Sequence, residues 1–313
     1  MSRVAVLSGG VGAARLLAGL VRVVPPGDVT AVVNVADDMV LHGLAISPDL
    51  DTVVYTVAGA IDPVRGWGLR DETWQAMATL ERYGGQTWFG LGDRDLGTHL
   101  YRTQRASEGA ALSTISGEIA RAWGLDLALV PVTDDPVRTM LTLAGPGGVA
   151  GDEVSFQDYF VARRHSVPVA SVRFAGVEAA TPAPGVLDAL AQADAVVVAP
   201  SNPIVSIGPV LAVPGVRAAV EARRDSVVAV SPLVGGKALK GPADRLLREL
   251  GHEDSVVGVA RLYAPFAGTL VIDTADADHA DAVRAAGLRC VVTDTIMRDP
   301  AAASALCAAA LGL

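Results

Sequence analysis

The 313-residue chain has only two cysteines, few aromatic residues and no long uncharged apolar run. Cys290 and Cys307 belong to no close pair and no Cys/His cluster, which argues against zinc, iron–sulfur and redox-dithiol sites. The opening segment MSRVAVLSGG reaches glycines before a signal-peptide core could form, and no stretch of about 18 apolar residues follows. We therefore expect a cytoplasmic protein that is not inserted in a membrane.

Positive charge is also scarce. The formal net charge is -9, and no run of lysines or arginines stands out against it. Such a chain repels the nucleic-acid backbone, so we expect a small-molecule substrate and no nucleic-acid partner. If the substrate is anionic, a metal ion, a few basic side chains or backbone N–H groups must overcome the negative field locally.

The apolar residues predict an α/β fold. Hydrophobic residues make up 51% of the chain and aromatic residues 4%, so the core must consist largely of Ala, Val and Leu. An apolar strand at 4–8, a glycine loop, a helix at 13–24 and a strand at 29–35 indicate a parallel pair joined by a crossover helix. Further strands are expected at 127–132, 195–199, 226–231, 256–260, 269–273 and 288–292. We predict a Rossmann-like, mainly parallel sheet flanked by helices.

A change of composition indicates an insertion in this core. Residues 59–121 contain three of the four tryptophans, paired glycines and many charges, which favours an inserted, mainly helical subdomain. Residues 1–58 and 122–313 would then form the nucleotide-binding core. A stretch rich in Gly and Pro at about 145–185 is predicted to be a strand-bearing excursion from it.

The glycine loop lies where a doubly wound sheet binds phosphate, between its first strand and the next helix. Its sequence matches neither standard motif, because Arg15 replaces the third glycine of a dinucleotide fingerprint and the Gly-Lys-Ser/Thr of a P-loop is absent. Arg15 could face phosphate oxygens or be a solvated helix arginine, and the loop could be a tight turn without a ligand. The candidate phosphate-binding residues are Gly9, Gly10, Val11, Gly12, Ala13 and Arg15.

Two later loops also follow predicted strands, at 200–208 and 231–241. Because the carboxyl ends of parallel strands share one edge of the sheet, the three loops together predict a nucleotide cleft. The alternatives are an Asx turn with a helix cap for the first loop and solvated lysines at 237 and 240 for the second. The candidate residues are Ser201, Asn202, Pro203, Ser206, Ser231, Gly235, Gly236 and Lys237.

Four carboxylates cluster near the predicted phosphate loop. Asp37 and Asp38 end a strand, and Asp49 and Asp51 precede an apolar stretch. An oxygen-only set beside a phosphate site suits Mg²⁺, although Asp49 and Asp51 could instead be a helix cap and a first-turn acid. A second polar group at residues 93–95 lies in the insertion, where it could contact a second substrate or form a solvated ion-pair patch.

In their order along the chain, these motifs resemble the 2-phospho-L-lactate transferase family, including its actinobacterial phosphoenolpyruvate transferase branch. The resemblance covers nearly the whole length and depends on the ordered set of segments. These are GGVG at 9–12, DD at 37–38, SPDLDT at 47–52, DPVRGWG at 62–68, LGDRD at 91–95, FQDYF at 156–160, PSNPIVSIGP at 200–209 and SPLVGGK at 231–237. Ala13 departs from it, because close relatives tend to have glycine there.

The resemblance implies a step in making coenzyme F-420. The donor would be a guanosine diphosphate derivative carrying lactate or enolpyruvate on its distal phosphate, the acceptor would be 7,8-didemethyl-8-hydroxy-5-deazariboflavin, and GMP would leave. It implies Mg²⁺ held by Asp37 and Asp51, with Asp49 or Asp51 orienting the attacking hydroxyl. It also implies an acceptor pocket completed by the insertion, and it leaves a homodimer open. The implied acceptor-binding residues are Asp51, Gly90, Asp93, Arg94 and Asp95.

Two other functions are compatible with a strand, glycine loop and helix. An NAD(P)-dependent oxidoreductase is disfavoured by the missing third glycine. A non-catalytic regulator that senses a nucleotide sugar would keep the nucleotide loops and lack the acceptor-binding set. The retained pair Asp49 and Asp51, together with residues 93–95, favours an enzyme.

Overall fold

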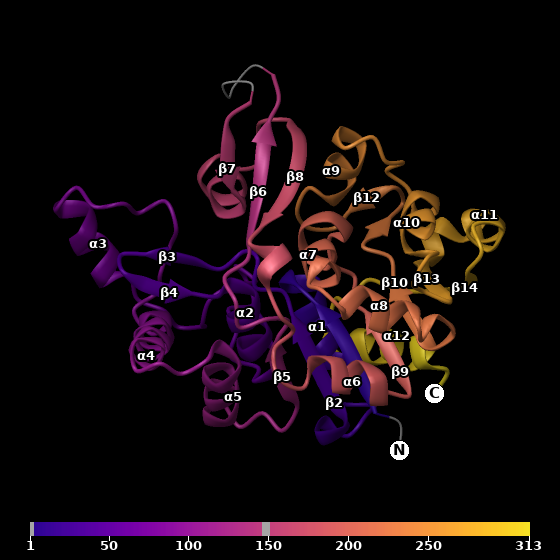
Figure 1. Ribbon diagram of the computed structural model, residues 1–313, viewed down its shortest axis with the longest axis horizontal. Helices are drawn as coiled ribbons and strands as arrows, with labels where there is room; N and C mark the ends of the chain where they lie inside the picture. The colour runs from indigo at the N-terminus through magenta and orange to yellow at the C-terminus, as the bar shows by residue number, and fades with distance from the viewer. Residues whose placement is uncertain (1–2, 146–150) are drawn as a thin grey trace.

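Seven parallel strands form the central sheet, in the order β14-β13-β10-β9-β1-β2-β5 (Figure 1). The computed structural model describes residues 3–145 and 151–313. The strands are β1 Val4–Ser8, β2 Val29–Val33, β5 Ala128–Pro131, β9 Ala195–Val198, β10 Val227–Val230, β13 Thr269–Asp273 and β14 Arg289–Thr293. Helices flank this sheet, so the predicted α/β class is confirmed.

The core of the sheet consists of small aliphatic residues, as the composition predicts. Every residue of β1, β10 and β13 is buried, because strands covered by helices on both faces have no solvent side. Around this core, α1 Gly10–Leu20 packs against α2 Pro48–Val57 and α12 Pro300–Leu311. The other core helices are α6 Val186–Gln192, α7 Gly208–Ala212, α8 Val216–Glu221, α9 Ala243–Glu249, α10 Val256–Tyr263 and α11 Ala280–Ala285.

One predicted strand is wrong. Residues 256–260 begin α10, and the side chain of Ser255 caps this helix by accepting the N–H groups of Val257 and Gly258. Periodicity cannot distinguish a short apolar run in a strand from one in a buried helix. The signal that decides here is the serine before the run, a preferred residue at helix starts.

A small separate core lies beside the main sheet, at the left of Figure 1. It joins the hairpin of β3 Met39–Leu41 and β4 Leu44–Ile46 to residues around α3 Gln75–Arg82 and α4 Asp95–Ser107. By contrast, α5 Leu112–Ala122 packs on β5 and contributes to the main core. The division at residues 59 and 121 therefore stays a prediction.

A three-stranded antiparallel sheet projects at the top of Figure 1. Its order is β7-β6-β8, formed by β6 Arg138–Leu143, β7 Glu153–Ser155 and β8 Val169–Ala175. It has its own apolar cluster, which includes Leu141, Val154 and Tyr159. Part of the predicted excursion, residues 146–150, lies outside the described residues. A short hairpin, β11 Leu233–Val234 and β12 Lys237–Ala238, follows β10.

The strand order creates a switch point beside β1. The chain proceeds from β1 to β2 on one side, whereas β9 pairs with β1 on the other. The loops after β1 and β9 therefore diverge at the carboxyl edge, where open α/β sheets bind ligands. Within the described ranges, none of the helices has both the length and the hydrophobicity needed to span a bilayer.

Candidate functional site

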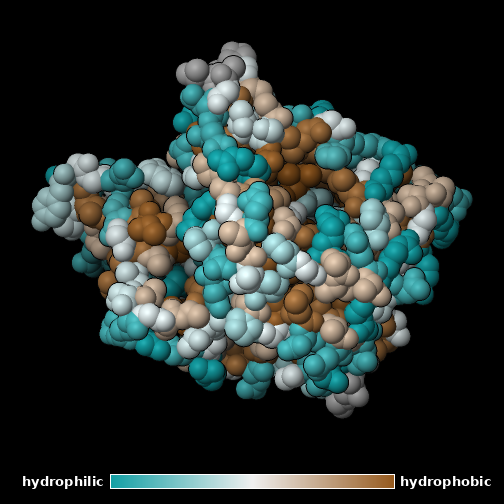
Figure 2. Space-filling model, in the orientation of Figure 1, coloured by the Kyte–Doolittle hydropathy of each residue, from teal (hydrophilic) through white to brown (hydrophobic). Residues whose placement is uncertain are grey.

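A cavity of about 660 Å³ opens at this edge of the sheet. Figure 2 shows hydrophobic residues gathered around a hollow between the β6-β7-β8 sheet and α9. The loops after β1, β9 and β10 all contribute to its wall, so the predicted convergence of three strand-end loops is present. The candidate residues that line it are Gly9, Gly10, Val11, Gly12, Arg15, Asp37, Asp49, Gly90, Ser201, Asn202, Ser206 and Ser231.

The loops after β1 and β9 fit closely together. A Cβ atom added to Gly12 would lie 2.4 Å from the Pro200 carbonyl oxygen, and one added to Gly9 would lie 2.8 Å from Ser206 Cβ. Ser201 Oγ donates a hydrogen bond to the Gly9 carbonyl at 2.7 Å. Gly10, Val11 and Gly12 line the cavity, so the amino end of α1 borders it. Asp49 accepts the Gly10 N–H, which leaves the N–H groups of the following residues in this first turn for a ligand.

Replacing Gly12 with alanine is expected to disrupt this contact. The added methyl group would overlap the backbone of Pro200, so we expect a loss of about 1–3 kcal/mol in the free energy of unfolding and weaker binding of inorganic pyrophosphate. Gly27→Ala is the matched control, because a Cβ at Gly27 has open space around it. Chemical unfolding and calorimetry measure the two effects. Equal stability and affinity in the two variants would contradict the close packing.

Asp37 and Asp49 form a buried acidic pair on the cavity wall. Asp49 lies in the first turn of α2, where its Oδ1 accepts the Gly10 N–H at 2.9 Å. The side-chain amide of Asn34 donates to both carboxylates, at 3.0 Å to Asp49 and 3.2 Å to Asp37. Burial raises the pKa of Asp49 to about 6, and burial together with the neighbouring Asp49 raises the pKa of Asp37 well above its ordinary value.

These two carboxylates suit a divalent cation. Asp37 Oδ1 is buried without a hydrogen-bond partner, so one oxygen in the pair is available as a ligand. Two neighbouring carboxylates repel each other when both are ionised, and a cation between them removes that cost. Mg²⁺ usually takes one or two carboxylates, with phosphate and water oxygens completing its coordination. The residues present therefore fit Mg²⁺ in combination with a phosphate ligand.

Asp51 occupies the opposite side of the same helical turn. It does not line the cavity, and its carboxylate pairs with the buried guanidinium of Arg102 from α4. His99 Nδ1 lies 3.7 Å from Asp51 Oδ2. Burial raises the pKa of Asp51, whereas Arg102 and His99 oppose that shift. Asp51, Asp95 and His99 are close enough to share a cation, but Arg102 already supplies a positive charge there. The predicted roles of Asp51 in metal and acceptor binding stay predictions.

The polar group in the insertion supports local structure. Asp93 accepts the N–H groups of Gln75 and Ala76 at the start of α3, and Asp95 accepts the Tyr55 hydroxyl at 2.6 Å. Arg94 donates to the carbonyl of Arg70. None of the three residues 93–95 is among those that line the cavity. Their predicted acceptor contacts therefore stay predictions, and the structure gives each side chain an intramolecular partner.

Several candidate donor-binding residues also lie outside the cavity lining. They are Ala13, Pro203, Gly235, Gly236 and Lys237. Ala13 and Pro203 are buried, and the two glycines form the turn of the β11–β12 hairpin. Lys237 is exposed on β12. Asn202 fits both predictions made for its loop. It lines the cavity, and it also forms the Asx turn, in which its Oδ1 accepts the Ile204 N–H at 2.9 Å.

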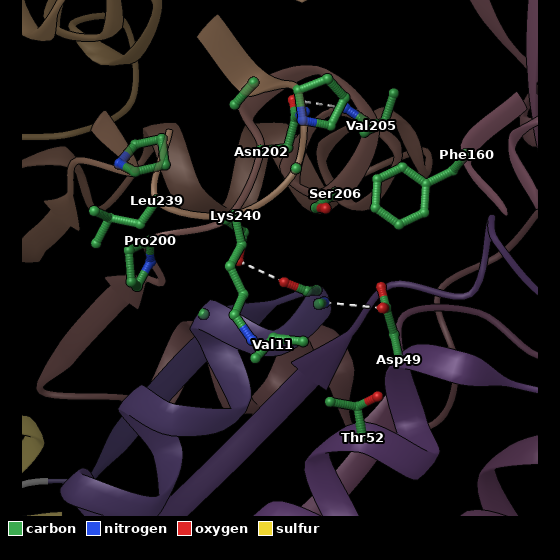
Figure 3. A pocket seen from close by; sticks show the side chains of 18 of the residues that line it. Val11, Asp49, Thr52, Phe160, Pro200, Asn202, Val205, Ser206, Leu239 and Lys240 are labelled. Atoms are coloured by element: carbon green, nitrogen blue, oxygen red, sulfur yellow. Dashed lines mark hydrogen bonds between the residues drawn. The ribbon is translucent and has the colours of Figure 1, made fainter. Parts of the chain in front are cut away.

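The sequence interpretation missed an aromatic side of the cavity. The rings of Phe156 and Phe160 are stacked with centroids 5.3 Å apart, and His165 stacks on Phe160 at the same distance. Phe160 faces the space above Asp49 in Figure 3. All three side chains line the cavity. Phe156 and Phe160 belong to the FQDYF segment, where paired aromatics before a polar loop were the available signal.

A second aromatic wall comes from the insertion. Trp67 and Phe89 line the cavity, and the Arg65 guanidinium lies 5.5 Å from the Trp67 ring and 5.1 Å from the Trp74 ring. A Cβ atom on Gly90 would lie 3.4 Å from both tryptophans. Gly90 therefore gives the chain room to pass these rings at the cavity edge.

The charge of the cavity differs in sign from that of the chain. Its lining includes the cations Arg15, Arg164, Lys240 and Arg298, whereas Asp37 and Asp49 are the carboxylates among the described lining residues. Lys240 and residues 295–298 were not among the candidates. The second group follows β14 at the same edge of the sheet, so strand order was the signal that could have found it. This surplus of positive charge favours an anionic ligand.

Comparison with known proteins gives one consistent result. A family model described as "2-phospho-L-lactate transferase CofD" matches residues 4–307. A protein of Streptomyces griseus named phosphoenolpyruvate transferase is 43% identical over 99% of this chain and 98% of its own length. A protein of the same name from Mycobacterium avium is 41% identical over 99% and 98%. A Bacillus halodurans structure of the UPF0052 family shares the fold, with a TM-score of 0.62, 17% identity and 97% coverage of both chains.

Proposed function

The chain belongs to the 2-phospho-L-lactate transferase CofD family, and from this membership we propose a reaction in coenzyme F-420 biosynthesis. It transfers a phosphoenolpyruvyl or 2-phospholactyl group from a guanosine diphosphate-linked donor to 7,8-didemethyl-8-hydroxy-5-deazariboflavin. GMP is released, and the product is coenzyme F-420-0 or its dehydro form. The name of the two actinobacterial relatives favours the phosphoenolpyruvyl donor.

The observation that carries this proposal is the position of the acidic pair next to the amino end of α1. The Gly10 N–H contacts Asp49, so phosphate-binding backbone and cation-binding carboxylates meet at one point of the cavity wall. Phosphoryl transfer depends mainly on alignment and charge neutralisation, which these groups supply. A cavity of about 660 Å³ is within the range of small-molecule sites.

The proposed step needs no protein nucleophile. The primary hydroxyl of the acceptor attacks the distal phosphorus of the donor, and the bond from that phosphorus to the bridging oxygen breaks. The bridging oxygen leaves with GMP, and the hydroxyl proton passes to the carboxylate of Asp49, which faces the cavity beside the amino end of α1. Mg²⁺ held by Asp37 and Asp49 would neutralise charge on the donor phosphates.

The two aromatic walls support a planar acceptor. Phe156 and Phe160 offer ring faces on one side of the cavity, and Trp67 and Phe89 border it from the insertion. A deazaflavin ring can stack on such faces, while its ribityl chain reaches toward Asp49. The structural fit and the family membership together favour a transferase over the oxidoreductase and the nucleotide-sugar sensor.

Guanine nucleotide is expected to stabilise the protein. A ligand that binds only the folded state, at 100 times its Kd, adds about 2.7 kcal/mol to the free energy of unfolding. We therefore expect GDP with Mg²⁺ to raise the melting temperature measured by scanning fluorimetry, and ADP with Mg²⁺ to raise it less. No shift with GDP in folded protein would contradict the proposed donor. The mass of the product formed from each synthetic donor, which differs by two hydrogens, identifies the three-carbon acid.

A further inference from the structure

Lys240 approaches the phosphate loop from a separate element. It lies in the segment between β12 and α9, and Figure 3 shows its side chain extending from that segment toward α1 near Val11. Burial lowers the pKa of Lys240, and the nearby Arg15 on α1 lowers it further. Lys240 and Arg15 both line the cavity. Two cations from different parts of the chain therefore meet beside the amino end of α1.

Neither cation has an acidic partner in the part of the chain that the structure describes. Across residues 3–145 and 151–313, no carboxylate lies within salt-bridge distance of Arg15 or Lys240. Arg15 donates only a long hydrogen bond, at 3.4 Å, to the carbonyl of Met297. Other arginines in the chain commonly have acidic partners, such as Arg298 with Asp294 on the same cavity rim. Two like charges left uncompensated beside helix N–H groups form a local anion site.

The Lys240 ammonium lies beside Gly66 of the insertion. A Cβ atom added to Gly66 would lie 2.7 Å from Lys240 Nζ, so the lysine rests against the insertion at a residue without a side chain. Gly66 has φ +72°, a conformation that glycine adopts without strain. Lys240 and Lys237 are both exposed, and they differ in that Lys237 lies on the preceding strand and does not line the cavity.

We propose that Lys240, together with Arg15, binds the diphosphate of the nucleotide donor as it lies over the amino end of α1. The inference rests on the proposed function for the nucleotide, and adds the side chains that neutralise its phosphates. The ammonium acts as a point charge on phosphate oxygens, whereas Asp37 and Asp49 act through a cation. The donor is therefore held between cationic groups contributed by α1, the β12–α9 segment and the metal site.

The test compares two lysines that are three residues apart. Calorimetry measures the Kd of Mg²⁺–GDP and of Mg²⁺–pyrophosphate for the parent, Lys240→Met, Lys240→Arg and Lys237→Met, after thermal unfolding has shown that each variant is folded. Loss of one charged hydrogen bond is expected to raise both Kd values about 10- to 100-fold in Lys240→Met. Lys240→Arg should recover most of this affinity, and Lys237→Met should change it by about twofold or less.

The two probes separate this inference from the proposed function. Equal affinities of Lys240→Met and Lys237→Met for pyrophosphate would overturn the role of Lys240. If the parent binds pyrophosphate and not GDP, the guanine donor is wrong, and the lysine comparison on pyrophosphate still decides the anion site. Failure of the parent to bind either probe would overturn both.

Discussion

Replacing Asp49 with asparagine is expected to lower turnover by about 10²- to 10⁴-fold in a protein that remains folded. The amide keeps the size of the side chain, and its oxygen can still accept the Gly10 N–H, so the loop after β1 keeps its support. The variant loses the negative charge that holds the cation beside Asp37 and the base that accepts the hydroxyl proton. Turnover is measured across Mg²⁺ concentrations, with Asp225→Asn, at a fully exposed carboxylate, as the control.

The same carboxylate predicts a pH dependence. Burial raises the pKa of Asp49 to about 6 in the metal-free protein, so below this pH Mg²⁺ must displace a proton from the carboxyl, and Mg²⁺ binding and transfer should fall as pH decreases through 6. The effect of this carboxyl on the free energy of unfolding changes with pH in the opposite direction. A carboxyl whose pKa is higher in the folded protein than in the unfolded chain stabilises the fold at low pH, and this contribution is lost as pH rises from about 4 through 6. Near-parental turnover of Asp49→Asn, or a profile flat through pH 6, would contradict the assignment.

The architecture of the core was largely accessible from the sequence because its strands are short apolar runs followed by glycine or polar loops. The beginning of the chain shows this, since the strand Val4–Ser8 ends before Gly9 and the helix α1 begins directly after that glycine. The same rule failed at residues 256–260, where an apolar run begins α10. A run of five apolar residues is too short to show whether its periodicity is that of a helix or a strand, and the decisive Ser255 lies outside the run.

The convergence of the strand-end loops was predictable for a topological reason, whereas the different surroundings of Asp49 and Asp51 were not. Parallel strands end at one edge, so the loops after β1, β9 and β10 had to lie together. Asp49 and Asp51 are two residues apart in a helix and point in different directions. Asp49 faces the cavity, whereas Asp51 pairs with Arg102, which lies 51 residues further along the chain. No local pattern contains that information.

The sequence also could not distinguish the two lysines of the loop after β10. Lys237 and Lys240 belong to one glycine-rich loop and look equivalent in sequence. The β11–β12 hairpin ends at Ala238, so Lys237 lies on a strand facing solvent while Lys240 lies in the segment that returns to the cavity. The contact of Lys240 with Gly66 joins parts of the chain that are remote in sequence. Assigning the lysine therefore required the tertiary structure.

Breaking the pair of Asp51 and Arg102 is expected to produce the largest loss of stability. Arg102 is 2% exposed and Asp51 is 5% exposed, so removal of either leaves the other charge buried without its main partner. Removing one partner of a buried ion pair typically costs about 3–5 kcal/mol, which we expect for Arg102→Met in chemical unfolding. Asp51→Asn should also be destabilising, because it leaves the guanidinium without its carboxylate.

The double variant Asp51→Asn/Arg102→Met distinguishes a structural role of Asp51 from a role in transfer. The double variant should be more stable than Arg102→Met alone, because it leaves no buried charge without its partner. If Asp51 serves only as the partner of Arg102, the folded fraction of Asp51→Asn keeps near-parental turnover. If Asp51 contacts the acceptor or the cation, turnover is lost in Asp51→Asn and stays lost in the double variant. Parental stability of Arg102→Met would show that the buried pair contributes little to the fold.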